Sequence, residues 1–326
     1  MSNLAMSVPG LPAGLRLTQL SRDHAADLTD LVRAKELTFF QRSETNTKEI
    51  LGTLSAPELD GTRGTAGVWD DGRLLAAMLA FNGLQHERGL YLDLFISPHA
   101  PNRRGLATTL LTAGERYGQT LPAPDDAYLK VESFGGDREI RQALAERGYE
   151  RHRVYLRMRV DFVGETPRPR PVPGISVKGM SEDLWPELHR VVTESFRDHY
   201  DSHPLPFDLF RRDMINETTD LDRWRLAFDG PTCVGVSIGS RRFEPEGLGY
   251  VETLGVLREY RGRGIARHLL LDAMARDAAA GLTGTSLHCD ATNPTGATAL
   301  YESVGMRRDH EYVAWRTPLR GNSLLH

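Results

Sequence analysis

Hydrophobic and polar positions follow two periods along the chain, and together they predict alternating strands and helices. In the second half, apolar positions with a period of two predict strands at 175–178, 225–228, 232–240, 249–256, 285–290 and near 311–316. Apolar positions three or four residues apart predict helices at about 182–197, 206–215, 268–280 and 295–304. The turn pair Asp229-Gly230 joins two of the strands. This mixture of elements predicts an α+β domain.

The first half repeats the same order of elements. Its strands are predicted at 15–20, 65–69, 74–81, 90–96, 127–132 and 154–160, and its helices at about 22–37, after 107 and at 139–147. Segment 164–174 lies between the halves and has four prolines within seven residues, a composition that favours an extended spacer. A repeat of about 155 residues indicates two copies of one domain rather than a solenoid. We therefore expect domains at 1–163 and 175–326, joined by this proline-rich linker.

Composition and charge argue against several classes of protein. The chain has 326 residues and a net charge of −4, whereas a dedicated nucleic-acid-binding protein normally has a basic excess. No apolar run approaches the roughly 18 residues of a membrane span, and the N-terminus does not resemble a secretory signal. The two cysteines, Cys233 and Cys289, are too few for a disulfide framework or a cysteine-zinc site. We expect a cytoplasmic protein that binds neither nucleic acid nor membrane.

The strongest candidate for a binding site is the glycine loop, which we define as Arg261-Gly262-Arg263-Gly264-Ile265-Ala266. It joins a predicted strand to a predicted helix, and helix N-termini attract anions through their amide groups and their dipole. Gly264 would let the backbone approach a phosphate, and the arginines at 261, 263 and 267 add positive charge. The alternative is a loop whose arginines are only solvated. No Walker motif is present, and an arginine replaces the third glycine of a dinucleotide fingerprint.

Two segments resemble the signatures of the GNAT acetyltransferase superfamily. Val256–Leu271 (VLREYRGRGIARHLLL) matches the pattern [RQ]-x-x-G-x-[GA] at Arg261, Gly264 and Ala266. Asn293–Met306 resembles the second signature, N-x-x-[AS]-x-x-L-Y-x-x-x-G-[FM], although one extra residue follows the asparagine. The resemblance covers nearly all of 175–319, and a weaker copy covers about 15–162.

This resemblance implies two tandem GNAT-like domains, each a splayed, mostly antiparallel sheet flanked by helices. Acetyl-CoA would be the cosubstrate, with its diphosphate on the glycine loop and its pantetheine arm on the strand before that loop. A β-bulge is expected at Gly255, where an amide could stabilise the oxyanion of the reaction. The residues expected to bind the cosubstrate are Leu254, Gly255, Val256, Arg261, Gly262, Arg263, Gly264, Ile265, Ala266 and Asn293.

Two residues are candidates for proton transfer. An amine acceptor with a pKa of about 10 is almost entirely ammonium at neutral pH, so a base must take its proton before it attacks the thioester. The resemblance implies that Glu252, on the strand before the loop, is this base, although it could instead bind a cationic acceptor or be solvated. Tyr301 matches the family tyrosine that protonates the leaving thiolate, although a core tyrosine would fit the pattern as well.

A short histidine-containing loop and one cysteine bear on metal binding, on an acetyl-cysteine route and on the acceptor pocket. Asp198–His203 has two histidines four residues apart, but prolines follow, which indicates a loop rather than a metal-binding helix face. We expect no metal, and we expect this loop to border the acceptor. Cys289 lies in a predicted buried strand, so we interpret it as a packed thiol rather than an acetyl carrier. The predicted acceptor pocket consists of Phe196, His199, Tyr200 and Tyr250.

The first copy lacks both proton-transfer candidates. Asn102 replaces the leading arginine of its loop, Leu92 occupies the position of Glu252, and Leu144 occupies that of Tyr301. We therefore predict an N-acetyltransferase that acts in its second domain, by direct attack, on the primary amine of a small molecule. This tandem layout is similar to that of the mycothiol synthases. The alternatives are a protein acetyltransferase or an acyl-CoA-binding sensor without catalysis, and the assembly would be a monomer or a homodimer.

Overall fold

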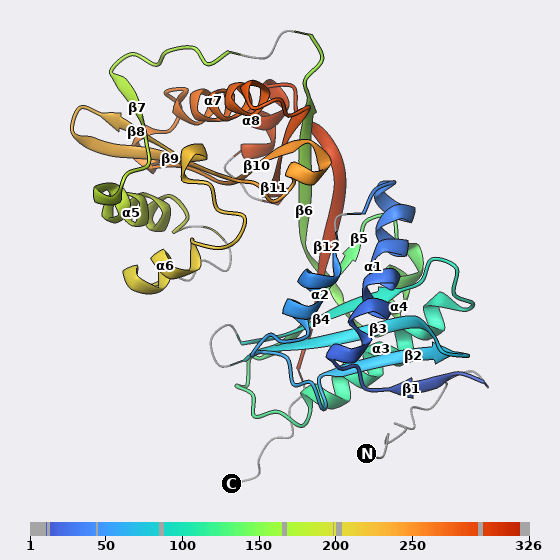
Figure 1. Cartoon of the computed structure of the whole chain (residues 1–326). Helices are drawn as coiled ribbons and strands as arrows, with labels where there is room; N and C mark the ends of the chain where they lie inside the picture. Colours follow the sequence, from blue (N-terminus) through green and yellow to red (C-terminus); the bar gives the residue numbers. More distant parts are fainter. Residues whose placement is uncertain are drawn as a thin grey trace. The chain divides into compact units, whose positions relative to one another are not determined.

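The strands and helices occur in two successive copies, as their hydrophobic periods predicted (Figure 1). The computed structural model describes residues 11, 14–43, 45–84, 88–164, 168–197, 199, 204–292 and 296–319. The first copy contains β1 (Arg16–Thr18), α1 (Ala25–Phe40), α2 (Thr47–Thr53), β2 (Thr65–Asp70), β3 (Arg73–Gly83), β4 (Gly89–Ile96), α3 (Arg103–Gly118), β5 (Tyr128–Phe134), α4 (Arg138–Glu146) and β6 (Glu150–Asp161).

The second copy repeats this order after the proline-rich segment. It contains β7 (Ile175–Gly179), α5 (Trp185–Ser195), α6 (Phe207–Asp213), β8 (Arg225–Asp229), β9 (Thr232–Ser240), β10 (Leu248–Val256), α7 (Ile265–Ala279), β11 (Gly284–Asp290), α8 (Ala297–Ser303) and β12 (Arg307–Pro318). Short 3-10 helices are η1 (Arg22–His24), η2 (Glu182–Leu184), η3 (Leu221–Arg223), η4 (Glu244–Glu246) and η5 (Arg258–Tyr260).

The chain divides in space into two units that do not coincide with its two copies. Unit 1 is Met1–Val154 together with His310–His326, and unit 2 is Tyr155–Asp309. The reason is that the last strand of each copy completes the sheet of the other unit. β12 pairs with β5 in unit 1, and β6 pairs with β11 in unit 2. The boundaries expected from the sequence, 1–163 and 175–326, separate the copies along the chain but do not show this exchange.

The sheet of unit 2 has the strand order β6-β11-β10-β9-β8-β7. Strands β10 and β11 run parallel, and the other neighbours in this order pair antiparallel. The ladder between β10 and β11 extends from Leu248 opposite Gly284 to Val251 opposite Leu287. Beyond Val251, β10 continues to pair with β9. The sheet therefore opens between β10 and β11, as expected for a splayed, mostly antiparallel sheet.

Helices cover both faces of the sheet in unit 2 (Figure 1). α5 packs on β9 and β10, where Trp185, Leu188 and Val191 join a buried cluster with Val236 and Ile238. α7 packs on the other face of β9 and β10, and Ile265 and Leu269 join a second buried cluster there. The alternation of apolar residues along the strands supplies both clusters because successive side chains point to opposite faces.

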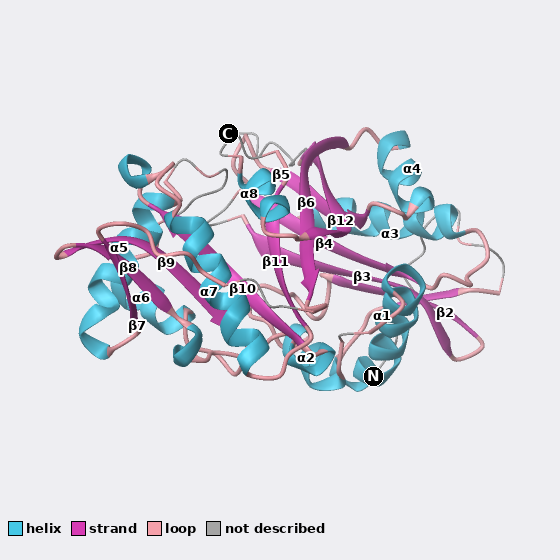
Figure 2. Ribbon diagram, turned by 90° about the horizontal axis from the view of Figure 1, so that it is seen from above, coloured by secondary structure: helices cyan, strands magenta, loops and turns pink. Residues whose placement is uncertain are grey.

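Unit 1 has the corresponding strand order, β1-β2-β3-β4-β5-β12. Its parallel pair is β4 and β5, whose ladder ends where Leu92 lies opposite Val131. Figure 2 shows α1 and α3 on either side of β3 and β4. The apolar faces of these helices lie in separate buried clusters, which contain Leu28 of α1 and Leu110 of α3 respectively. Each unit thus repeats the same layered arrangement around its own core.

Two differences from the expected elements concern helices. α2 was not predicted, because its seven residues are too short to show a helical period, and its N-terminus depends on a capping box between Asn46 and Glu49. α7 begins at Ile265, three residues before the expected start, because the glycine loop leads directly into it. Among the described residues, no helix is long and apolar enough to span a membrane.

Candidate active site

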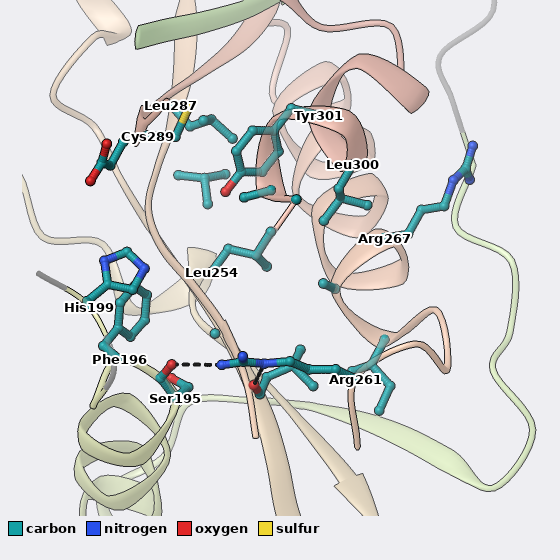
Figure 3. Close-up of a pocket in the computed structure, with 18 of the residues that line it drawn as sticks. Ser195, Phe196, His199, Leu254, Arg261, Arg267, Leu287, Cys289, Leu300 and Tyr301 are labelled. Atoms are coloured by element: carbon teal, nitrogen blue, oxygen red, sulfur yellow. Dashed lines mark hydrogen bonds between the residues drawn. The ribbon is translucent and has the colours of Figure 1, made fainter. Parts of the chain in front are cut away.

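A pocket of about 420 Å³ opens in unit 2 where β10 and β11 separate (Figure 3). Its walls come from the end of α5, the second half of β10, the glycine loop, the end of β11 and α8. The sequence-predicted residues that line it are Phe196, His199, Glu252, Leu254, Gly255, Val256, Arg261, Gly262, Gly264, Ile265, Ala266 and Tyr301. Residues predicted from separate motifs therefore lie around one cavity.

The glycine loop presents the N-terminus of α7 to this pocket. Gly264 precedes the helix with φ 85°, and Gly262 has φ 78°, both in the left-handed region that favours glycine. No side chain caps the helix, and its first turn has no acidic residue. A Cβ atom at Gly264 would have Val172 Cγ2 as its nearest neighbour, at 4.0 Å. Because first-turn amides lack partners within the helix, this terminus is suited to bind an anion.

Arg261 lines the pocket, and its guanidinium also binds two carbonyl groups of the protein itself. Its Nε donates to the carbonyl oxygen of Val256 at 3.1 Å, and its second amino group donates to the carbonyl oxygen of Ser195 at 3.0 Å. The guanidinium thus holds the end of β10 to the end of α5, as the dashed lines in Figure 3 show. We had expected its charge at the phosphate site, whereas its hydrogen bonds here go to two carbonyl groups.

The two other arginines near the loop point to different partners. Arg263 is not among the pocket-lining residues, because it forms an ion pair of 2.7 Å with Asp229 at the β8–β9 turn. Arg267 lines the pocket and donates to the carbonyl oxygen of Ser303 at 3.3 Å. Of these two arginines, Arg267 is therefore the one that lies at the pocket.

The β-bulge lies at Glu252 and not at Gly255, where we expected it. β10 pairs with β9 through Val251 opposite Gly239 and then Thr253 opposite Ile238, so Glu252 is the extra residue. The bulge interrupts the alternation of the strand. Both Val251 and Glu252 consequently line the pocket.

Gly255 is explained by close packing instead. It pairs regularly with Val236, but a Cβ at this position would clash with Ser195 Oγ and would lie 3.1 Å from Phe196 Cε2. The end of α5 therefore lies directly on the strand. Glycine provides the space that this contact requires.

Tyr301 projects from α8 toward the centre of the pocket (Figure 3). Its side chain is largely buried, at 8% exposure. Burial, and to a lesser extent the neighbouring Cys289, raises the pKa of Tyr301 well above its usual range. The hydroxyl group is thus protonated at neutral pH and available as a donor.

Cys289 lines the pocket from β11, although we expected a packed thiol in a buried strand. Burial raises the pKa of this thiol to about 11. The thiolate is the nucleophilic form of cysteine, so a thiol with this pKa is nearly inert at neutral pH. This agrees with the interpretation that Cys289 does not carry the acetyl group.

Aromatic and carboxylate side chains also line the pocket. The Phe196 and His199 rings contact each other with centroids 4.8 Å apart, and both line the pocket. Tyr250 is not among the lining residues. Its hydroxyl forms a hydrogen bond of 2.9 Å with Nδ1 of His288, which does line the pocket. Asp290 lies in the lining as well.

Comparisons with known proteins agree with this geometry. Residues 185–306 match the model of the acetyltransferase (GNAT) family. A protein of Geodermatophilus obscurus named mycothiol acetyltransferase is 30% identical over 253 residues, which cover 74% of this chain and 78% of the relative. The chain belongs to the GNAT acetyltransferase family. It is an N-acetyltransferase, and members of this family take the acetyl group from acetyl-CoA.

Solved structures of the family share the tandem fold. A GCN5-related N-acetyltransferase from Sphaerobacter thermophilus has a TM-score of 0.80 at 24% identity and covers 96% of this chain and 99% of its own. A tandem GNAT protein from the clavulanic acid biosynthesis pathway has a TM-score of 0.70 at 14% identity, with 95% and 100% covered. At these identities the likeness concerns the fold.

Some expected site residues cannot be placed. Asn293, expected to bind CoA, and Tyr200, expected in the acceptor pocket, lie outside the described residues. His203 of the candidate histidine pair does so too. Among the residues that are described, no group of three or more histidine, cysteine or acidic side chains is positioned to hold a metal ion.

Sequence reasoning overlooked Ser195, His288 and Asp290, which also line the pocket. One signal was available for the two β11 residues. β11 was predicted to follow β10, and the carboxyl ends of two parallel strands meet at the same edge of a sheet. Had their parallel pairing been assumed, His288 and Asp290 would have been placed beside Glu252. Ser195 carried no such signal, since its contact depends on how α5 packs.

Proposed function

We propose that this protein transfers the acetyl group of acetyl-CoA to the primary amine of a small molecule, and that the reaction takes place in the pocket of unit 2. One observation carries the proposal: the uncapped N-terminus of α7, the open edge of β10, Glu252 and Tyr301 all border the same cavity. A site that only bound CoA would need the helix N-terminus but neither of the two proton-carrying groups.

Acetyl-CoA would bind along two features of the pocket. Its diphosphate accepts hydrogen bonds from amides at the start of α7, and Arg267 adds positive charge. Its pantetheine arm lies along Leu254–Val256, where the ladder between β10 and β11 has ended. An extended ligand can pair with such a strand edge through main-chain hydrogen bonds. This arrangement directs the thioester toward Glu252 and Tyr301.

The chemistry then requires proton transfer at the amine nitrogen and at the departing sulfur. Glu252 accepts a proton from the ammonium group of the acceptor, directly or through a water molecule, and the amine nitrogen attacks the thioester carbon. A backbone amide of β10 stabilises the oxyanion that forms. The carbon–sulfur bond breaks as the intermediate collapses, and Tyr301 donates its proton to the departing sulfur. As the intermediate collapses, the nitrogen releases its second proton to solvent, and solvent returns a proton to the tyrosine. Glu252 then releases the proton that it took, so the products are the amide, CoA and one proton.

The acceptor side of the pocket favours a small cationic amine. Glu252 and Asp290 place two carboxyl groups at the pocket, and Phe196 and His199 supply flat ring surfaces. A volume of about 420 Å³ falls in the range of small-molecule sites. The relative from Geodermatophilus obscurus is named mycothiol acetyltransferase, so an acceptor of that type is the first to test.

The proposal is tested by measuring the release of CoA thiol from acetyl-CoA in the presence of single acceptors. The panel contains a mycothiol-type amine, aminoglycosides, amino acids and peptides, and mass spectrometry identifies the acetylated product. We expect N-acetylation of at least one small amine, and loss of this activity in Glu252→Gln. Turnover with peptides alone would favour a protein acetyltransferase. Binding of acetyl-CoA without turnover on any amine would contradict the proposal.

A further inference from the structure

The strand that supports the acceptor side of the pocket comes from the first half of the chain. β6 pairs with β11 from Asp161 opposite Gly284 to Tyr155 opposite Asp290. This register places Arg157 opposite His288, whose side chain lines the pocket. The first copy thus contributes structure to the site that the second copy builds.

Arg157 is the exceptional residue on this strand. Its side chain is fully buried, at 0% exposure, although it carries a charge. One amino group lies 3.1 Å from Glu246 Oε2, and Nε lies 3.8 Å from Asp309 Oδ2. The guanidinium carbon lies 4.1 Å from the centre of the Phe243 ring. Burying a charged pair generally stabilises a fold no more than apolar packing would, so stability alone does not explain a buried arginine at this position.

A chain of contacts leads from Arg157 to the pocket. The ring of Phe243, below the guanidinium, meets the ring of Tyr250 edge to face, with centroids 4.8 Å apart and an interplanar angle of 89°. The Tyr250 hydroxyl is hydrogen-bonded to His288 Nδ1 at 2.9 Å. Since His288 lines the pocket, each side chain in this series limits the orientation of the next. Phe243 and Tyr250 are themselves buried, so neither ring has room to turn independently.

We propose that His288 contacts the acceptor amine and that Arg157, through Phe243 and Tyr250, is its positioning residue. The inference rests on the acetyl transfer proposed above. The hydrogen bond with Tyr250 fixes the imidazole at Nδ1, so the ring is held in place where His288 lines the pocket. The first copy, although it lacks the proton-transfer residues, is then required for recognition of the acceptor in unit 2.

The test uses the full-length chain with three single variants, Arg157→Met, Tyr250→Phe and His288→Ala, and the doubles that combine each of the first two with His288→Ala. Each single variant is expected to lower kcat/KM for the acceptor by about ten- to a hundred-fold. The Kd for acetyl-CoA should stay within about twofold of the wild-type value, because the glycine loop is untouched. The doubles should be no worse than His288→Ala alone, since the residues act in series.

Two controls separate positioning from loss of folding. Arg159→Met removes another arginine of β6, one that pairs with Asp161 at 2.6 Å outside the pocket, and should leave acceptor kinetics unchanged. Arg157→Lys should recover part of the loss, since lysine keeps the charge near Glu246 but cannot stack on Phe243 as a planar group.

The outcomes distinguish this inference from the proposed function. Additive losses in the doubles, or an Arg157→Met variant with wild-type acceptor kinetics, would overturn the role of Arg157 while acetyl transfer stands. Equal weakening of acetyl-CoA binding and acceptor kinetics in Arg157→Met would also overturn it, since that pattern reports general damage. A wild-type protein that acetylates no amine would overturn the proposed function and this inference together.

Discussion

The N-termini of α3 and α7 occupy equivalent places in the two copies, but they differ in their caps. Among the described residues, a side chain caps α3 and none caps α7. α3 is preceded by Asn102 with φ 50°, and the side-chain oxygen of Asn102 accepts a hydrogen bond from the amide of Gly105 at 3.1 Å. α7 is preceded by Gly264, which has no side chain to do this. The first copy therefore satisfies with its own side chain an amide that the second leaves available.

The strands before these helices, β4 in unit 1 and β10 in unit 2, differ in the side chains that lie against them. Lys35 is buried in unit 1 and donates to the carbonyl oxygen of Leu94 on β4 at 2.8 Å, and its ammonium group lies 4.6 Å from the centre of the Phe134 ring. With Ile96 aligned on Val256, Leu94 corresponds to Leu254, where we place the pantetheine arm. Phe95 corresponds to Gly255. A binding cleft in this fold thus depends as much on absent side chains as on catalytic ones.

The largest expected effect comes from disrupting the proposed phosphate site at the N-terminus of α7. Gly264→Glu introduces a negative charge and an unfavourable backbone conformation at φ 85°. We expect acetyl-CoA binding to weaken by more than about a hundredfold, measured by isothermal titration calorimetry. Gly281→Glu is a matched control, since Gly281 has φ 82° just beyond the opposite end of the same helix. Equal affinity of the two variants for acetyl-CoA would contradict the assignment of the diphosphate to the glycine loop.

The next effect separates binding from chemistry in unit 2. Tyr301→Phe keeps the buried ring but removes the proton donor, a position that is Leu144 in the first copy. We expect kcat to fall by about a hundred- to a thousandfold, with little change in the Kd for acetyl-CoA. Burial raises the pKa of Tyr301, so the group stays protonated and should not produce an alkaline limb near neutral pH. A variant with wild-type kcat would exclude Tyr301 from the mechanism.

A smaller effect concerns Lys35, the charged residue buried beside β4 of unit 1, and the pH dependence of the free energy of unfolding. Burial lowers the pKa of Lys35 to about 8, against about 10.4 in the unfolded chain. Between these values the unfolded chain binds more protons, so the free energy of unfolding should rise with pH. From pH 8 to 10 we expect a gain on the order of 2 kcal/mol relative to Lys35→Met. Urea unfolding of both proteins at several pH values measures it, and parallel curves would contradict the assignment.

The smallest effect concerns the cap of α3. Asn102→Gly keeps the left-handed backbone but removes the capping oxygen, and should lower the free energy of unfolding by a few tenths of a kcal/mol. Titration should give one acetyl-CoA per chain for the wild-type protein and for this variant, because Lys35 and Phe95 still fill the strand edge. A stoichiometry of two for the wild-type protein would show that the first copy binds the cosubstrate despite its cap.

Much of the candidate site was predictable because its residues belong to contiguous motifs. The glycine loop was identified from its own residues, Glu252 and Tyr301 were identified from the resemblance to the GNAT signatures, and the pocket brings them together. The β-bulge predicted at Gly255 was wrong, because the bulge lies at Glu252. Glycine suits both a bulge and a close contact, and only the packing of α5 shows that the close contact applies here. The orientation of Arg261 was beyond prediction because its partners, the carbonyls of Val256 and Ser195, come from two separate elements.

The sequence by itself determined the two-copy plan, the mixed fold, the loop that begins α7 and the leucines that stand in the first copy where Glu252 and Tyr301 stand in the second. All of these depend on local periodicity, turn chemistry and residue type, which are readable along the chain. Only the tertiary structure decided that β6 and β12 exchange between the units. The last strands of the two copies have similar patterns of burial, so the pattern alone does not show which sheet each strand completes. Long-range pairing made that choice, and it is the reason that Arg157, from the first copy, lies behind a pocket of the second.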